Sequence, residues 1–434
     1  MAKPKTKRQK RRTARNIFIA VLVVLLLGVG ACAALNVVSN TKLMTYAKSF
    51  SPISYSDQLK PTRDRDTGCT TFTTDNDFHV LEIADLHIGG GFLSLRKDMK
   101  ALTCVASMIA AEKPDLVVFT GDIAFPVPHL AGTINNIRPA HALSSMMEKL
   151  GVYWCVCFGN HDTEIYSLGN RTKISMIYSD TSLYPHSLFE VGPKEVDGYG
   201  NYAINVKNSQ GIITQTLYLL DSHAYTGYDI FGIFWKYDNI HQNQVDWYKG
   251  QLKKMNAANQ QAIANLNLSE AETKKLTQQY GNAKSLLFLH IPLMEYHTLF
   301  REYADNGYKD TADVKHIYGT VGEKDEMIGC SEKEDALFEA VLAEKSTTGV
   351  FCAHDHYNNF SFEYKGVRLS YCGAVDYLAY RDIAVNGSQR GCTSIVSHAD
   401  GTFDSQYENY YQPKFESSIN EKVTMQKLNP NMEN

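Results

Sequence analysis

The sequence predicts an α/β fold in which two stacked β-sheets are flanked by helices, preceded by one N-terminal transmembrane helix. Over residues 78–158, apolar strand-like runs alternate with amphipathic helical segments, as in βαβ units. Two further alternating runs surround Asn208-Ser209-Gln210-Gly211, which is typical of a β-hairpin and indicates a second sheet. Residues 17–38 form a nearly continuous apolar segment, close to the roughly 20 residues that a helix needs to cross a bilayer.

The N-terminal segment, residues 1–16, is strongly basic and carries no acidic residue. Because positive flanks stay on the cytoplasmic side, we expect residues 17–38 to be a single-pass signal anchor in the cell membrane, with the body of the chain extracytoplasmic. Two alternatives remain open: Ala31-Cys32-Ala33 resembles a signal cleavage site, and residues 29–32 weakly resemble a lipoprotein site. The apolar run is longer than the roughly 7–15 residues of a signal core, which favours the uncleaved anchor.

The segments after the anchor divide by composition. Residues 39–76 are polar and rich in turn-forming residues, which predicts a linker. We expect one folded domain over residues 77–407 and a loosely held polar tail over residues 408–434. Expected strands cover residues 78–83, 116–120, 152–158, 200–206, 215–220, 286–290, 350–352, 360–364 and 367–371. Expected helices cover residues 96–112, 141–150 and 242–280, the last with a break near 267–269.

Composition narrows the class of protein. The chain has 434 residues, of which 44% are hydrophobic, so a core of ordinary size needs no covalent staples. The net charge is only -4, and no basic stripe follows the N-terminal segment, so we expect no nucleic-acid partner. The 9 cysteines are odd in number and show no Cys-x-x-Cys spacing, which favours buried apolar roles.

Side chains that bind metals follow several of the predicted strands, where each apolar run ends. They are Asp85, His87, Asp122, Asn160, His161, Asp162, His290, His354 and His356. An Asp-x-His is expected by chance about once in two such chains, but Gly-Asn-His-Asp on the order of once in a thousand. Strand ends can meet at one edge of a sheet, so we expect these residues to form one site.

Some of these residues also have simpler structural interpretations. Asp85 with His87, and Asp122, each suit a turn at a strand end. His290 is supported only by its place after the run 286–289. His354 and His356 project to the same side of an extended segment, which favours two ligands of one site.

The residue types indicate two-metal hydrolysis of a phosphate ester. Two divalent ions roughly 3.5–4 Å apart require a bridging carboxylate, for which Asp122 is the candidate. A hydroxide between the ions would attack phosphorus, and His161 is placed to protonate the leaving oxygen. Asp162 is expected either to orient the imidazole of His161 or to hold a turn.

In order and spacing, these motifs resemble the calcineurin-like metallophosphoesterase superfamily over roughly residues 78–400. The resemblance implies the sandwich of two sheets flanked by helices. It also implies one metal bound by Asp85, His87, Asp122 and His356, a second bound by Asp122, Asn160, His290 and His354, and His161 as the catalytic histidine. Segments 111–115, 198–202, 219–222 and 290–292 resemble the purple-acid-phosphatase-like branch of plants and fungi.

Two positions depart from the patterns of these proteins. Purple enzymes carry a metal-binding tyrosine three residues after the Gly-Asp aspartate, where this chain has Phe125. We therefore expect no iron(III)-tyrosinate colour. The usual Gly-His-x-His has Ala353 in place of its glycine, which removes no ligand.

The leading hypothesis is a membrane-anchored, extracytoplasmic enzyme that cleaves a small phosphorylated substrate with two divalent ions, manganese, iron or zinc. A phosphomonoester is favoured, a phosphodiesterase of nucleotides or lipid headgroups is the first alternative, and a catalytically silent cell-surface binding protein is the second. The sequence makes no prediction of oligomeric state. Candidates for substrate loops are Tyr296, His297, Tyr318, Tyr380 and Arg381.

Overall fold

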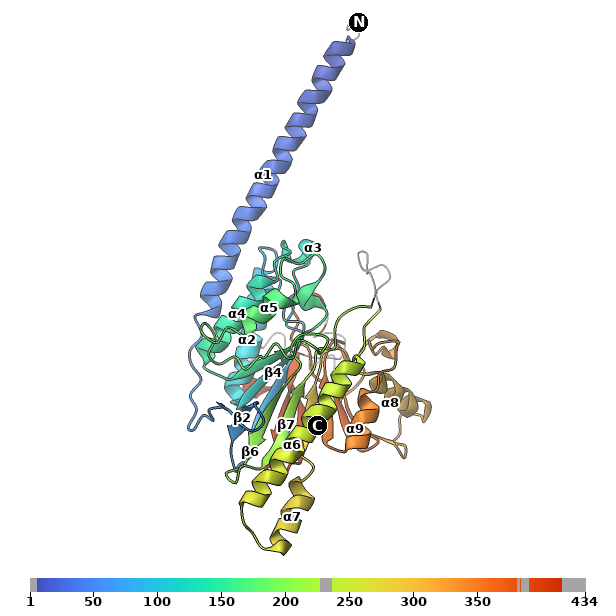
Figure 1. Cartoon of the computed structure of the whole chain (residues 1–434). Coiled ribbons are helices and arrows are strands. Elements are labelled where there is room, and N and C mark those ends of the chain that lie inside the picture. Colours follow the sequence, from blue (N-terminus) through green and yellow to red (C-terminus); the bar gives the residue numbers. More distant parts are fainter. Residues whose placement is uncertain (1–5, 227–235, 381–382, 384–389, 416–434) are drawn as a thin grey trace.

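Two β-sheets stacked face to face form the body of the protein, with helices on their outer faces (Figure 1). The computed structural model describes residues 6–226, 236–380, 383 and 390–415. The architecture agrees with the α/β sandwich that the sequence predicts.

The smaller sheet has the strand order β14-β13-β3-β4-β5. Its strands are β3 (Phe78–Ile83), β4 (Leu116–Thr120), β5 (Trp154–Cys157), β13 (Gly391–Ser397) and β14 (Phe403–Asn409). Strands β3, β4 and β5 are parallel, and β13 is antiparallel to β3. The crossover helices α2 (Leu95–Glu112) and α4 (Ile137–Leu150) contribute to the core beneath this sheet. Two short helices, α3 (Pro128–Ala131) and α5 (Arg171–Tyr178), lie in the connections after β4 and β5.

The larger sheet has the order β1-β2-β6-β7-β8-β10-β12-β11-β9. Its strands are β1 (Thr62–Arg63), β2 (Thr70–Thr73), β6 (Tyr202–Lys207), β7 (Ile213–Leu219), β8 (Ser285–Phe288), β9 (Val314–Tyr318), β10 (Thr347–Cys352), β11 (Ser361–Tyr364) and β12 (Val367–Tyr371). The predicted hairpin is confirmed as β6 and β7, which pair antiparallel. The predicted break separates helix α6 (Gln242–Asn265) from α7 (Glu270–Tyr280).

The larger sheet is buried on both faces. Along β7, Leu217 and Leu219 enter the core between the sheets, whereas Tyr218 faces a second core. That second core also includes side chains of α6, α8 (Met294–Asp305) and α9 (Leu337–Glu344). Strands covered on both faces need apolar side chains at successive positions, which explains the continuous apolar runs of the sequence.

Residues 39–76 are not the linker that the sequence indicated. Strand β2 pairs in parallel with β6 and extends the larger sheet, and Phe72 is fully buried against Phe78 and Tyr153. The three threonines of β2 are β-branched, so they suit a strand although they appear polar. The predicted tail also begins too early, because β14 extends to Asn409 and Phe415 is buried. Residues 416–434 lie outside the described residues.

Helix α1 (Lys7–Ala47) is long and apolar enough to cross a membrane. It rises away from one end of the domain, with α3 at that same end and α7 at the opposite end (Figure 1). The helix continues past the expected boundary at residue 38, and Ser39, Leu43 and Ala47 are buried against the domain. Asn36 Nδ2 donates a hydrogen bond of 2.9 Å to the carbonyl of Gly132. The apolar helix is therefore joined to the domain directly.

An ion pair between Asp64 and Lys207 holds the β1–β2 segment on the larger sheet. Removing this ion pair tests whether the segment packs there, which the sequence did not predict. Asp64 Oδ2 lies 2.6 Å from Lys207 Nζ, and Asp64 Oδ1 accepts from the Thr67 amide at 2.8 Å. Burial raises the pKa of Asp64, but Lys207 and Thr67 outweigh burial and hold the pKa below its usual value.

We expect Asp64→Asn to lower the free energy of unfolding by about 1 kcal/mol at pH 7, because the amide keeps the Thr67 contact but loses the charge. Since the folded-state pKa is depressed, this stabilisation is present above about pH 4 and is lost as the pH falls through the folded-state value. Urea unfolding of parent and variant at pH 7 and at about pH 3 measures the difference. A difference that is the same at both pH values contradicts the assignment.

Candidate metal centre

The predicted ligands come from the carboxyl ends of strands that meet where the two sheets adjoin. Asp85 follows β3 and Asp122 follows β4, while His290 follows β8 and His354 follows β10. The sheets contact each other at this edge, because the Asp85 carboxylate accepts from the His354 amide at 3.2 Å. The structure thus brings residues from both sheets to one place.

The backbone at these strand ends is unusual. Four of the predicted ligands, Asp85, His87, Asp122 and His354, adopt positive φ values of 50°, 48°, 51° and 84°. Side-chain-bearing residues rarely adopt this region, and such strain concentrates at functional sites. Gly121, at φ +91°, also needs its missing side chain, since a Cβ there would lie 2.6 Å from His290 Nδ1. The strained backbone and the crowded glycine therefore favour a functional site at these strand ends over the ordinary turn that Asp85, His87 and Asp122 could also form.

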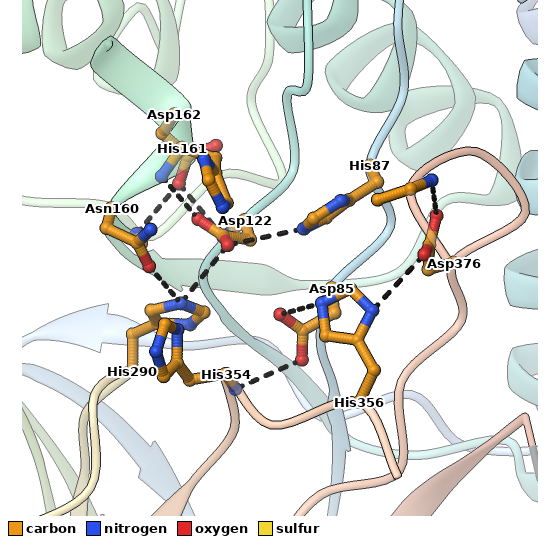
Figure 2. Close-up of polar contacts among 12 residues, drawn as sticks. Asp85, His87, Asp122, Asn160, His161, Asp162, His290, His354, His356 and Asp376 are labelled. Atoms are coloured by element: carbon orange, nitrogen blue, oxygen red, sulfur yellow. Dashed lines mark hydrogen bonds and ion pairs between the residues drawn. The ribbon is translucent and has the colours of Figure 1, made fainter. Parts of the chain in front are cut away.

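The predicted ligands form two adjacent clusters (Figure 2). One contains Asp85, His87 and His356, and the other contains Asp122, His290 and His354; within each cluster the candidate ligand atoms lie within 4.8 Å of one another. All six residues are buried. Side chains far apart in the sequence, such as those of Asp85 and His356, therefore meet in the arrangement expected of two metal sites.

Asp122 lies between the two clusters. Its Oδ2 atom is 3.3 Å from His87 Nε2 and also 3.3 Å from His290 Nε2. Asn160 Oδ1 lies 3.1 Å from His290 Nε2, so the amide joins the second cluster. Burial raises the pKa of Asp122, but His290 and His161 outweigh burial and hold the pKa well below its usual value. The carboxylate therefore stays ionised, as a bridging ligand must.

Unpartnered polar atoms show that the site suits cations. Asp85 Oδ1, His87 Nδ1 and His354 Nδ1 are buried without a hydrogen-bond partner among the described residues. Burial, followed by the neighbouring His290, lowers the pKa of His354 well below its usual value, which keeps this imidazole in the neutral form that binds metals. A set of imidazole nitrogens with carboxylate and amide oxygens suits zinc, iron or manganese. The residues present fit two divalent ions.

His161 lies at the mouth of the site, with its side chain 27% exposed. Its backbone amide donates to Asp122 Oδ1 at 2.8 Å, and its Nδ1 lies 2.6 Å from Glu164 Oε1. Burial lowers the pKa of His161, but the Asp122 and Glu164 carboxylates outweigh burial and raise it overall. A more basic imidazole beside the clusters is placed to donate a proton.

Asp162 does not orient the imidazole of His161. Its carboxylate accepts from the backbone amides of Asp122, Ala124 and Gly159 at 3.1, 2.9 and 2.8 Å. Because residues 161–163 form a single 3₁₀ turn, neighbouring side chains point in different directions. Of the two expectations for Asp162, the loop-holding role is the one that its hydrogen bonds fulfil.

Sequence reasoning missed three groups of the site. Glu164 contacts His161, Asp376 Oδ2 lies 3.2 Å from His356 Nδ1, and the Tyr225 hydroxyl accepts from Asn160 Nδ2 at 2.8 Å. Glu164 was detectable from its position one helical turn after His161. Asp376 was detectable because it follows β12, as the predicted ligands follow their strands.

Aromatic rings surround the clusters. Phe125, at the position where purple enzymes carry tyrosine, stacks on His87 with ring centroids 4.5 Å apart. Tyr380 packs on His356 at 4.2 Å, and Tyr237 contacts His354 edge to face at 4.4 Å. Of the other substrate-loop candidates, Tyr296 is buried in the core, His297 is exposed on α8, Tyr318 ends β9 and Arg381 lies outside the described residues.

A match to a family profile shows which protein family has this fold and site. The profile described as Calcineurin-like phosphoesterase matches residues 78–358, which is more than half of the chain. The chain belongs to this family. The resemblance noted from the sequence motifs is thereby confirmed, and the two clusters correspond to the two-metal requirement of calcineurin-like phosphoesterases.

Proteins of plants and yeast are similar in sequence to this calcineurin-like phosphoesterase. "Probable inactive purple acid phosphatase 14" of Arabidopsis thaliana is 29% identical over 72% of this chain and 74% of that protein. "Phosphatase DCR2" of Saccharomyces cerevisiae is 28% identical over 69% of this chain and 48% of that protein. A solved dimetal phosphatase from Danio rerio is 12% identical, with a TM-score of 0.46 over 77% of this chain and 97% of that one.

Proposed function

We propose that this calcineurin-like phosphoesterase is a membrane-anchored, extracytoplasmic phosphohydrolase that cleaves phosphate esters, with monoesters favoured, using two divalent ions. The observation that carries the proposal is the position of Asp122 between two buried ligand clusters, with the imidazole of His161 beside it. The basic flank and apolar run of α1 support the anchor and its orientation.

Each residue has a role that its contacts support. Asp85, His87, Asp122 and His356 would hold one ion, and Asp122, Asn160, His290 and His354 the other. When bound, the ions would supply Lewis acidity toward phosphoryl oxygens and lower the pKa of water. His161 would donate a proton to the leaving-group oxygen. Asp376 and Tyr225 would orient His356 and Asn160, and Asp162 would hold the loop that carries Asp122.

A second candidate function is a catalytically silent binding protein. The word "inactive" in the names of several plant relatives favours it. The seven ligand-type residues and His161 are all present and adjacent in this chain, which supports an active enzyme instead. Lipid-headgroup or nucleotide diesters remain the alternative substrate class.

The full chain, purified in detergent, should bind about two divalent ions per chain. With manganese, iron or zinc restored in turn, it should hydrolyse an aryl phosphate monoester faster than the corresponding diester. Metal analysis and release of the aryl alcohol measure both properties. A folded protein that binds two ions but is inert toward both esters would favour the silent binding protein, and one that binds no metal would overturn the proposal.

Glu164 is expected to act through His161 as a positioning residue. We expect Glu164→Gln to reduce kcat about 10–100-fold with bound metal unchanged. Since Glu164 raises the pKa of His161, its loss lowers that pKa, so the alkaline limb of the kcat profile should move to lower pH. Steady-state kinetics across pH test this, with Glu164→Asp as the partial rescue. An unshifted alkaline limb would show that Glu164 has only a structural role.

A further inference from the structure

Four exposed aliphatic side chains lie in three loops at one end of the domain. They are Leu93, Ile134, Ile165 and Leu168, exposed to 53%, 36%, 85% and 59%. Hydrogen bonds tie these loops to one another. The Leu93 amide donates to the carbonyl of Ala131 at 3.2 Å, and the Leu168 amide donates to the carbonyl of Ile134 at 3.1 Å. We call these four residues the apolar loop surface.

The segments that carry this surface contain no charged residue, and the nearest charges are those of Arg96, Asp122, Arg138, Glu164 and Arg171, which border them. Residues 89–95, 123–137 and 165–170 contain no Asp, Glu, Lys or Arg, although 21% of the whole chain is charged. Exposed loops of soluble proteins are usually polar, and burying a charge in lipid is costly. Three adjacent uncharged segments with large exposed apolar side chains indicate a surface that contacts a partner less polar than water.

Helix α1 fixes the position of the apolar loop surface relative to the membrane-spanning segment. Besides the contact of Asn36 with Gly132, the Ser39 hydroxyl donates to the carbonyl of Gly91 at 2.9 Å. Gly91 and Gly132 belong to the same loops as Leu93 and Ile134. The base of the apolar part of α1 is therefore hydrogen-bonded to the loops of the apolar loop surface.

The length of the apolar run of α1, residues 17–38, places the bilayer boundary at the level of the apolar loop surface. At about 1.5 Å per residue, residues 17–38 span about 33 Å, close to the roughly 30 Å of a hydrocarbon core. The run ends at Val38, between the two residues of α1 that bond to the loops. With α1 across a bilayer, the loops lie at the boundary between hydrocarbon and headgroups.

We propose that the apolar loop surface docks on the same bilayer that α1 crosses. The occupant is lipid, because α1 brings these uncharged segments to the membrane boundary whatever other proteins are present. Uncharged segments with exposed apolar side chains suit the interfacial region, where each buried apolar side chain adds to binding. The inference rests on the proposed membrane anchorage and does not depend on the proposed hydrolysis.

Photo-cross-linking of the full chain in phosphatidylcholine–phosphatidylglycerol nanodiscs tests this proposal. The photoreactive residue p-benzoylphenylalanine replaces one of three positions at a time. Ile165 tests the docking surface, Val23 of α1 tests the anchorage, and Leu183 is the matched control. Leu183 is 59% exposed, as is Leu168 of the apolar loop surface. It lies four residues before Ser187, which bridges Trp154 at the opposite end of β5 from Asn160.

We expect lipid adducts from Val23 and Ile165 and at least about tenfold fewer from Leu183. Adducts from Val23 without adducts from Ile165 would overturn the docking surface and leave the anchorage intact. A Val23 variant without adducts would overturn the anchorage, and the docking surface with it. Equal adducts from Ile165 and Leu183 would show contact without preference and would also overturn the proposal.

Discussion

Asp122→Asn is expected to remove both bound metal and activity. The substitution keeps the size of the side chain but removes the charge of a carboxylate that lies 3.3 Å from one histidine of each cluster. Loss of a group that merely orients a ligand already costs about 10–100-fold, so we expect a loss of more than about 100-fold here. Metal analysis of the purified variant and its rate on an aryl phosphate measure the two effects.

Asp115→Asn provides the matched control. Asp115 accepts a hydrogen bond from the amide of His79 at 2.8 Å, and an asparagine oxygen can replace it in that role. This variant should keep about two ions and most of the activity. If Asp122→Asn retains two ions and activity while both variants remain folded by circular dichroism, Asp122 is not the bridging ligand.

His161→Ala should separate catalysis from metal binding. The ring of His161 is partly exposed at the mouth, and its contact with Asp122 is made by its backbone amide, which alanine retains. We expect kcat to fall about 10²–10⁴-fold, the usual contribution of acid catalysis, while the metal content stays unchanged. Rates and metal content measured on the same preparation test both parts of this expectation.

The choice of substrate sharpens that test. A leaving group of low pKa needs little protonation, so the rate lost in His161→Ala should be smaller for a nitrophenyl ester than for an alkyl phosphate. His316→Ala, an exposed histidine on β9, is the control that should keep the parent rate. An equal loss for both leaving groups would contradict the acid role and favour a role for His161 in positioning substrate.

The sequence was sufficient for most of the central strands. Strands such as β4 and β8 are buried on both faces, so their residues form apolar runs that are visible without the structure. It was insufficient at the sheet edges. Strand β9 has four residues that are not buried, and β14 alternates between partly exposed and exposed residues over most of its length, so neither shows an apolar run.

For the site, the sequence predicted residues that directly follow a strand or form an improbable motif. The Gly-Asn-His-Asp motif and the pair His354 and His356 are examples, and the structure places them together. The sequence did not predict the site contacts that depend on the direction in which a side chain points. Asp162 and Glu164 are both acidic and close to His161 in sequence, yet the turn directs only Glu164 toward the ring. Such directions follow from backbone angles that composition does not reveal.

The direct join between α1 and the domain has a kinetic consequence. A flexible tether would let the domain sample a volume of solution, but the buried Ser39, Leu43 and Ala47 leave no such freedom. With α1 in a bilayer, the loop of His161 and Glu164 would remain beside Ile165, at the height of the headgroups. For a substrate confined to the same membrane, the relevant concentration is then molecules per unit area. Encounters occur by lateral diffusion in two dimensions, and diluting the surrounding solution leaves their frequency unchanged.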